Sequence, residues 1–184
     1  MALHMISVLG QATFLLDNLV GLGEVNAPVF DAEGVPLAGE NYRAELWGGS
    51  TPDALDPAQV LQGGARLFVP FTTRGYFSST EIFLSIPSSP PGGFAWLQVR
   101  AWDVCLGSTY EEVVALSLGG YGESPIFFAD GGDPFNQFPE PGRLIGLQSF
   151  SLRAIVPEPS PALLLLFALP FLLLRRLRSP RFGG

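Results

Sequence analysis

Glycine recurs at short intervals along the middle of this chain, and this punctuation constrains the fold more than any other feature. Sixteen glycines lie from Gly21 to Gly131, and they separate short runs that are rich in Val, Phe, Tyr and Trp. Turn residues at such spacing interrupt helices but suit the tight connections between short strands. The pattern predicts an all-β fold built as an antiparallel β-sandwich, with jelly-roll and immunoglobulin-like topologies both left open.

The clearest predicted strand covers residues 94–102, where aliphatic side chains alternate with aromatic and polar ones. Because successive side chains of a strand point to opposite faces, we expect the aliphatic set in the core and the other set partly exposed. Further strands are predicted at residues 13–16, 42–47, 66–71, 82–86 and 148–155. A short helix is predicted to begin near Ser108 and Thr109, with acids in its first turn, and to run through Ala115.

The charged and reactive residues exclude several classes of function. All ten basic residues are arginines, so Schiff-base chemistry, a lysine base and a Walker-type phosphate loop are excluded. One histidine, His4, and one cysteine, Cys105, are too few for a zinc finger, an iron–sulfur cluster or a disulfide framework within one chain. The net charge of −7 argues against a nucleic-acid partner. We expect no metal, no cofactor and no catalysis.

Charge and hydropathy change abruptly near the C-terminus. Residues 1–157 hold six arginines and sixteen acids, whereas residues 158–184 hold four arginines and one acid. The thirteen side chains of residues 162–174 carry no polar atom, and Arg175, Arg176 and Arg178 follow them directly. A helix of this length spans about 20 Å of a hydrocarbon core of about 30 Å. The proline-rich segment before it and the arginines after it favour a membrane-inserted helix over a buried core helix, with residues 1–157 outside the cell.

The C-terminal features, taken in order, resemble a PEP-CTERM sorting signal. Val156, Pro157, Glu158, Pro159 and Ser160 form the motif, and the apolar run and basic cluster follow it. The resemblance implies a bacterial exported protein that is processed by exosortase, a membrane enzyme, and that ends at the cell surface or in the extracellular matrix. On this reading residues 156–161 are a linker, 162–174 a transmembrane helix and 175–184 a basic cytoplasmic tail.

The body also resembles a recurring ectodomain of PEP-CTERM proteins. The resemblance rests on residues 25–31, with Gly34 and Tyr42 after them, and on residues 98–103 and 110–111. It implies a secreted or surface domain at residues 13–155. Residues 1–12 are mostly apolar but lack a basic start, so we expect the remnant of a signal peptide, with a weak complete signal and a first strand at residues 3–9 as alternatives.

Three candidate sites come from residue types alone. A Ser-His-Asp or Cys-His site would have to use His4 in the terminal segment, and Cys105 is expected to be a small buried apolar side chain, with a link between two chains as the alternative. Paired carboxylates would suit glycoside hydrolysis, but no spacing singles out a pair, and we expect these acids to be solvated. The acids considered are Glu45, Glu81, Asp103, Glu111 and Glu112. Residues 130–136 offer oxygen ligands for calcium, although turn chemistry also explains them.

Three tryptophans provide the sharpest alternative function. Trp47, Trp96 and Trp102, together with Phe94, would suit an aromatic platform that stacks on sugar rings. The competing interpretation is that these rings pack against the second sheet or a loop. The alternative to a purely structural surface protein is therefore a carbohydrate-binding surface module that associates with exopolysaccharide.

Overall fold

The structure is a computed structural model that describes residues 11–21, 23–136 and 140–156. The described residues as far as Ala154 belong to one compact unit. They form thirteen short or medium strands and one short helix, which confirms the all-β prediction and is consistent with a β-sandwich. No helix among them is both long and apolar enough to cross a membrane. The predicted transmembrane helix at residues 162–174 lies outside the described residues.

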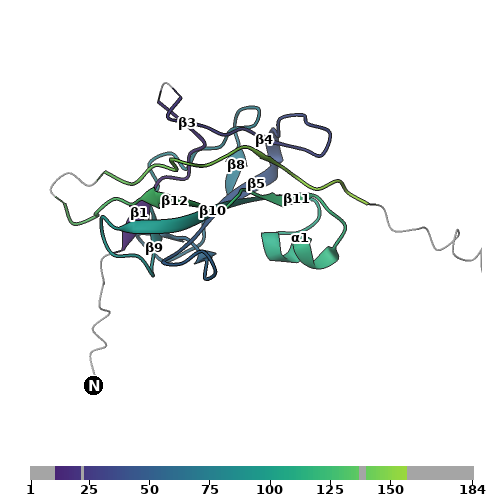
Figure 1. The fold of residues 1–184 in the computed structure, drawn as a ribbon. Coiled ribbons are helices and arrows are strands. Elements are labelled where there is room, and N and C mark those ends of the chain that lie inside the picture. The colour runs from purple at the N-terminus through teal and green to yellow at the C-terminus, as the bar shows by residue number, and fades with distance from the viewer. Residues whose placement is uncertain (1–10, 22, 137–139, 157–184) are drawn as a thin grey trace, which may run out of the picture. The chain divides into compact units, whose positions relative to one another are not determined.

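Two long antiparallel strands organise the main sheet (Figure 1). Strand β5 (Gly39–Gly49) pairs with β10 (Phe94–Asp103) along eight residues of each strand, from Trp96 opposite Gly49 to Asp103 opposite Tyr42. The long run of alternating side chains explains why β10 matches its predicted bounds so closely. Strand β5 extends beyond its prediction at both ends: Gly48 and Gly49 continue in register with β10, and Gly39 pairs with Phe71 of β8 after a shift in register.

Four short strands complete this six-stranded sheet. Strands β11 (Tyr121–Glu123) and β12 (Phe127–Asp130) both pair with β10, one toward each end. Strands β6 (Asp56–Pro57) and β8 (Val69–Phe71) both pair with β5, β6 toward its C-terminal end and β8 toward its N-terminal end. The predicted strand at residues 66–71 is therefore real only in its second half.

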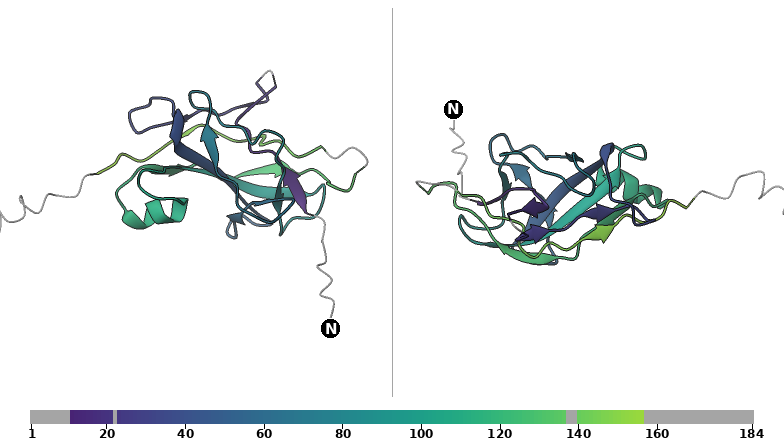
Figure 2. Two further views of the ribbon diagram at one scale, coloured as in Figure 1. Left: turned by 180° about the vertical axis from the view of Figure 1, so that it is seen from behind. Right: turned by 90° about the horizontal axis from the view of Figure 1, so that it is seen from above.

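A second sheet contains three short strands. Strand β9 (Leu84–Ile86) lies in the middle, with β1 (Ala12–Phe14) on one side and β7 (Gln59–Val60) on the other, both antiparallel. Figure 1 shows β1 and β9 toward one end of the long strands and the helix toward the other, and the view from behind in Figure 2 agrees.

Two further strand pairs lie outside these sheets. Strands β2 (Leu19–Val20) and β3 (Val25–Asn26) form an antiparallel pair, whereas β4 (Val29–Phe30) and β13 (Phe150–Ser151) run parallel. The prediction of wholly antiparallel pairing is thus wrong for β4 and β13. Strands β4 and β13 are far apart in the sequence, with most of the domain between them, so no hairpin turn joins them. Strands that are joined by a long stretch of chain can pair in parallel.

Both larger sheets contribute to one apolar core. The aliphatic set of β10 is buried as predicted, with Leu97 and Val99 fully so, and β1 and β9 supply Phe14 and Ile86. Gly48 allows the close approach between the sheets, because a Cβ there would lie 2.5 Å from Cδ1 of Ile86. The core therefore depends on a missing side chain as well as on apolar ones.

The one helix among the described residues, α1 (Tyr110–Leu116), begins as the sequence predicts. Thr109 is its N-cap, and its side chain accepts a hydrogen bond from the backbone N–H of Glu112. The Glu112 carboxylate in turn accepts from the N–H of Thr109, which completes a capping box. Ser117, in the left-handed conformation with φ of 57°, ends the helix.

Candidate functional site

The outer face of β10 holds the side chains that alternate with the core set. Phe94, Trp96 and Arg100 are at least partly exposed, as predicted, but Gln98 and Trp102 are buried. Trp102 is fully buried because α1 packs over it through Tyr110. The expectation that Trp102 is partly exposed is wrong, and its ring is not accessible for stacking on a sugar.

Trp47 on β5 lies beside two arginines. The guanidinium carbon of Arg100 lies 3.6 Å from the centroid of its ring, and that of Arg66 lies 5.7 Å away. Cations bind the electron-rich faces of indole rings. The ring face next to Arg100 is therefore already covered by a charged side chain, and we interpret Trp47 as part of the structural framework of this sheet.

Trp96 has a different environment, at the end of the sheet where β12 pairs with β10. Its ring centroid lies 5.1 Å from that of Phe128, which itself stacks on Phe94 at 4.8 Å. Phe94 is 54 % exposed and Phe128 is 47 % exposed. These three rings form the aromatic end of the sheet. Trp96 and Phe94 are the part of the predicted sugar platform that remains accessible, and Phe128 is an addition that the sequence did not predict.

A charged network lies between the sheet and α1. Glu45 is only 2 % exposed, and its two carboxylate oxygens accept hydrogen bonds from Nη2 of Arg66 at 2.7 and 2.6 Å. Arg66 also forms an ion pair with Glu111 on α1, with 3.1 Å between Nη1 and Oε1. The expectation that Glu45 is a solvated surface acid is therefore wrong, and its position ties the sheet to the helix.

Burial has opposite outcomes for the two carboxylates of this network. It raises the pKa of Glu45 above its usual value, although the hydrogen bonds and charge of Arg66 act in the other direction. Burial also acts to raise the pKa of Glu111, but hydrogen bonds from its own backbone and from Arg66 outweigh it, so the pKa is lowered. Both acids are engaged by the same guanidinium, which suits a structural role.

The remaining acids considered for catalysis lie in three different places. Glu112 caps α1, and the carboxylate of Asp103 accepts a hydrogen bond from the backbone N–H of Cys105 at 2.8 Å. Glu81 lies far along the chain from both, in a turn next to the second sheet. The structure thus pairs Glu45 with Glu111 through Arg66 and leaves Glu81 separate.

Cys105 lies on the surface in the turn that follows β10. The expectation that it is buried is wrong, because Cys105 is exposed. The hydrogen bond and negative charge of Asp103 raise the pKa of the Cys105 thiol. Its thiolate form is therefore disfavoured at neutral pH.

In the segment at residues 130–136, Asp130 ends β12 and Asp133 stabilises a turn. The carboxylate of Asp133 accepts a hydrogen bond from the N–H of Phe135 at 2.9 Å, which is the pattern of an Asx turn. Across the described parts of the chain, no group of three His, Cys, Asp or Glu side chains is placed to hold a metal ion.

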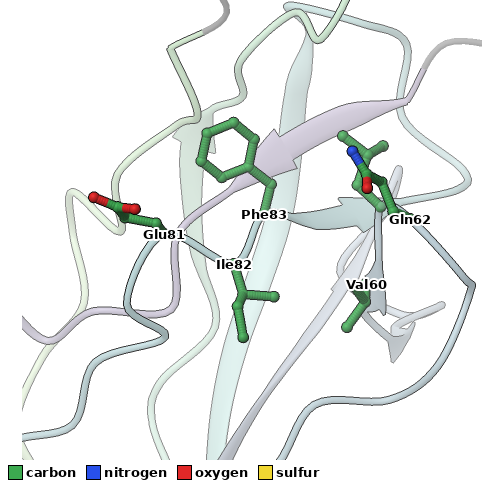
Figure 3. A pocket seen from close by; sticks show the side chains of 6 residues that line it. Val60, Gln62, Glu81, Ile82 and Phe83 are labelled. Atoms are coloured by element: carbon green, nitrogen blue, oxygen red, sulfur yellow. The ribbon is translucent and has the colours of Figure 1, made fainter.

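A cleft that the sequence analysis did not identify lies beside β7, at the edge of the second sheet. Its volume is about 440 Å³, and it lies between two chain segments, residues 60–62 and 81–83. In the view of Figure 3 the ring of Phe83 stands between the carboxylate of Glu81 and the amide of Gln62. The other lining residues, Val60, Leu61 and Ile82, are apolar.

The predicted sorting residues lie almost entirely outside the described part of the chain. Val156 is described and exposed. Pro157, Glu158, Pro159 and Ser160, the orienting arginines Arg175, Arg176 and Arg178, and His4 are outside it. The same holds for residues 1–10 of the expected signal remnant, whereas Ala12 begins β1.

Comparison with known proteins gives no relative from which a role could be transferred. No family model, no curated protein and no solved structure matches this chain.

Proposed function

We propose that this protein is an exported surface or extracellular-matrix protein, sorted through its C-terminal segment by exosortase and without catalysis of its own. The observation that carries the proposal is the order of three features within residues 156–184: a proline-flanked acid, thirteen apolar side chains and a cluster of arginines. Each feature is common alone, but the order resembles a PEP-CTERM signal. On this proposal the β-sandwich body lies outside the membrane and residues 162–174 anchor it as a transmembrane helix.

Physical chemistry gives each feature a task in such a signal. Pro157 and Pro159 restrict the backbone to extended conformations, in which carbonyls and side chains are free to meet an enzyme's binding cleft. Glu158 is the one acid of residues 158–184 and would be the charge that the enzyme reads. The apolar run stops translocation, and the arginines hold its end in the cytoplasm.

The last described residues are compatible with an accessible linker. Leu152 is buried, and its N–H donates to the carbonyl of Phe30 at 2.8 Å. Ile155 and Val156, which follow after only two more residues, are exposed. The body therefore ends just before the proline-flanked acid, and the segment that exosortase would bind begins close to the folded domain.

Replacing Glu158 with alanine tests the proposal. We expect Glu158→Ala to block trimming in a host that contains exosortase while leaving membrane insertion intact, because the change makes the segment more apolar. The mass of the mature protein is the readout. Glu33→Ala, which removes an exposed acid from a turn of the body, is the matched control and should be trimmed normally. Normal trimming of the Glu158→Ala protein would refute the assignment of the motif.

A carbohydrate-binding surface module is the second candidate function. The observation in its favour is the accessible aromatic end of the sheet, where Trp96 lies beside the exposed rings of Phe94 and Phe128. Aromatic rings provide an apolar surface for the C–H groups of a sugar. The partner on this proposal is an exopolysaccharide outside the cell.

A further inference from the structure

We infer that the cleft beside β7 is a binding site for a pyranose sugar unit that carries no acidic group. This inference rests on the carbohydrate-binding alternative and not on the sorting signal. It moves the binding site from the outer face of β10 to a cleft whose residues the sequence did not single out.

The cleft has the size and the lining of a small-molecule site. Its volume of about 440 Å³ falls in the range of small-molecule pockets. The half-buried ring of Phe83 provides apolar surface for the C–H face of a sugar. The Glu81 carboxylate accepts hydrogen bonds from hydroxyl groups, and the Gln62 amide both donates and accepts them.

Charge decides which sugars fit. None of the six lining residues is basic, and one, Glu81, is acidic. Residues 1–157 carry a net charge of −10, from six arginines and sixteen acids. A uronate or sulfated sugar would be repelled by this field and would find no cation in the cleft. Neutral and amino sugars meet no such penalty.

The backbone that carries Glu81 is strained. Thr80 and Glu81 have φ values of 45° and 64°, and the N–H of Ile82 donates to the carbonyl of Ser79. Two successive residues with positive φ form a type I′ turn, which ordinarily uses Asn and Gly. Neither Thr nor Glu favours this conformation, and a β-branched residue is a marked outlier in it.

The surrounding structure holds this turn in place. Ser79 is buried, its N–H donates to the carbonyl of Leu16 and to the carboxylate of Asp17, and its hydroxyl accepts from the N–H of Leu16. Strained residues that are fixed in this way concentrate at ligand sites. Glycine at residue 81 would suit this turn better than glutamate does. The presence of Glu81 beside the cleft therefore points to a role for its carboxylate in binding.

Calorimetric titration of the full chain tests the inference. The protein is held in lauryldimethylamine oxide micelles, which carry no sugar headgroup, and titrated with cellotetraose, chitotetraose and tetragalacturonate. We expect saturable binding of at least one of the first two and at least tenfold weaker binding of the uronate. If neither of the first two binds at millimolar concentration, or the uronate binds equally well, the inference is wrong.

Matched variants locate the site. Glu81→Gln should weaken binding at least tenfold with an unchanged melting temperature, because the shape is kept and the charge lost. Thr80→Asn should retain binding while raising the melting temperature by about 2–4 °C, because Asn tolerates the left-handed conformation. Glu81→Gly should raise the melting temperature and abolish binding.

One further variant separates the two sugar sites. Trp96→Ala removes a ring of the aromatic end of the sheet and should leave binding in the cleft unchanged. If Trp96→Ala abolishes binding while Glu81→Gln retains it, the cleft inference is overturned and the carbohydrate-binding alternative stands at the sheet. Trimming by exosortase should be normal in all these variants, so failure of binding and failure of sorting are distinguishable.

Discussion

Replacing Arg66 with methionine would test whether the buried Glu45 depends on a single partner. The variant keeps an apolar side chain of similar length but removes the guanidinium, whose central carbon lies 5.2 Å from the ring centroid of Phe68. Glu45 would then be left 2 % exposed without the two short hydrogen bonds that satisfy its carboxylate. The free energy of unfolding should therefore fall well beyond the loss of a surface ion pair.

The size of the loss follows from the burial of the two partners. Breaking a fully buried ion pair costs about 3–5 kcal/mol, because an uncompensated charge remains inside the protein. The side chain of Arg66 is 30 % exposed, so water screens part of the interaction. We expect a loss of about 2–4 kcal/mol at pH 7. Arg143→Met is the matched control and should lose less than about 1 kcal/mol, because Arg143 and its partner Glu24 are both more than half exposed.

The loss should also depend on pH. Burial raises the pKa of Glu45 in the folded protein, so its contribution to stability is present at low pH and is lost as the pH rises through that raised value. Without Arg66 the pKa rises further, and the penalty at neutral pH grows. The lowered pKa of Glu111 has the opposite pH dependence: its contribution to stability is present at neutral pH and is lost as the pH falls through that lowered value. Because Arg66 stabilises the ionised form of Glu111, removing Arg66 loses this contribution as well, and the gap between wild type and variant at neutral pH grows.

Urea denaturation of the variants at pH 4 and pH 7 measures both effects. The gap between the wild type and Arg66→Met should widen from pH 4 to pH 7. Adding Glu45→Gln to the variant should recover part of the loss at pH 7, because a neutral amide needs no cation. The reasoning is refuted if Arg66→Met loses no more than Arg143→Met, or if the gap is the same at both pH values.

Three other predictions follow from single contacts or from the tail. Leu152→Ala should lower the free energy of unfolding by about 2–5 kcal/mol in urea denaturation, because Leu152 is 5 % exposed and holds the C-terminal strand to the core. Thr109→Ala should cost about 1 kcal/mol in the same assay, because it removes the N-cap of α1. Replacing three arginines by serine should scramble the topology of the membrane segment in a protease-protection assay, and unchanged topology would contradict their orienting role. These arginines are Arg175, Arg176 and Arg178.

Local patterns in the sequence were sufficient for some elements. The alternation in β10 predicts both its bounds and its core face, and the cap at Thr109 predicts the start of α1. Each pattern depends on neighbours a few residues apart. The short strands β6 and β7, at two residues each, carry no such pattern, because pairing with a distant strand defines them.

Long-range contacts explain why the candidate sites differ from their predictions. Trp102 is buried by a helix that begins eight residues later, and Glu45 is buried by an arginine that lies 21 residues away. The amphipathic spacing of Tyr110 and Val113 was a usable signal that α1 covers an aromatic side chain. The turn at Thr80 and Glu81 gave none, because neither residue type predicts a left-handed backbone.

On the proposal of a sugar site in the cleft, the placement of four glutamates, Glu45, Glu81, Glu111 and Glu112, favours binding over cleavage. The two-carboxylate route of glycoside hydrolysis needs an acid and a second carboxylate on either side of the bond. Glu45 and Glu111 share Arg66, and Glu112 is committed to the cap of α1. The lining of the cleft contributes Glu81 alone. One carboxylate beside an aromatic ring and an amide suits the recognition of hydroxyl groups, so we expect a sugar to bind there and leave unchanged.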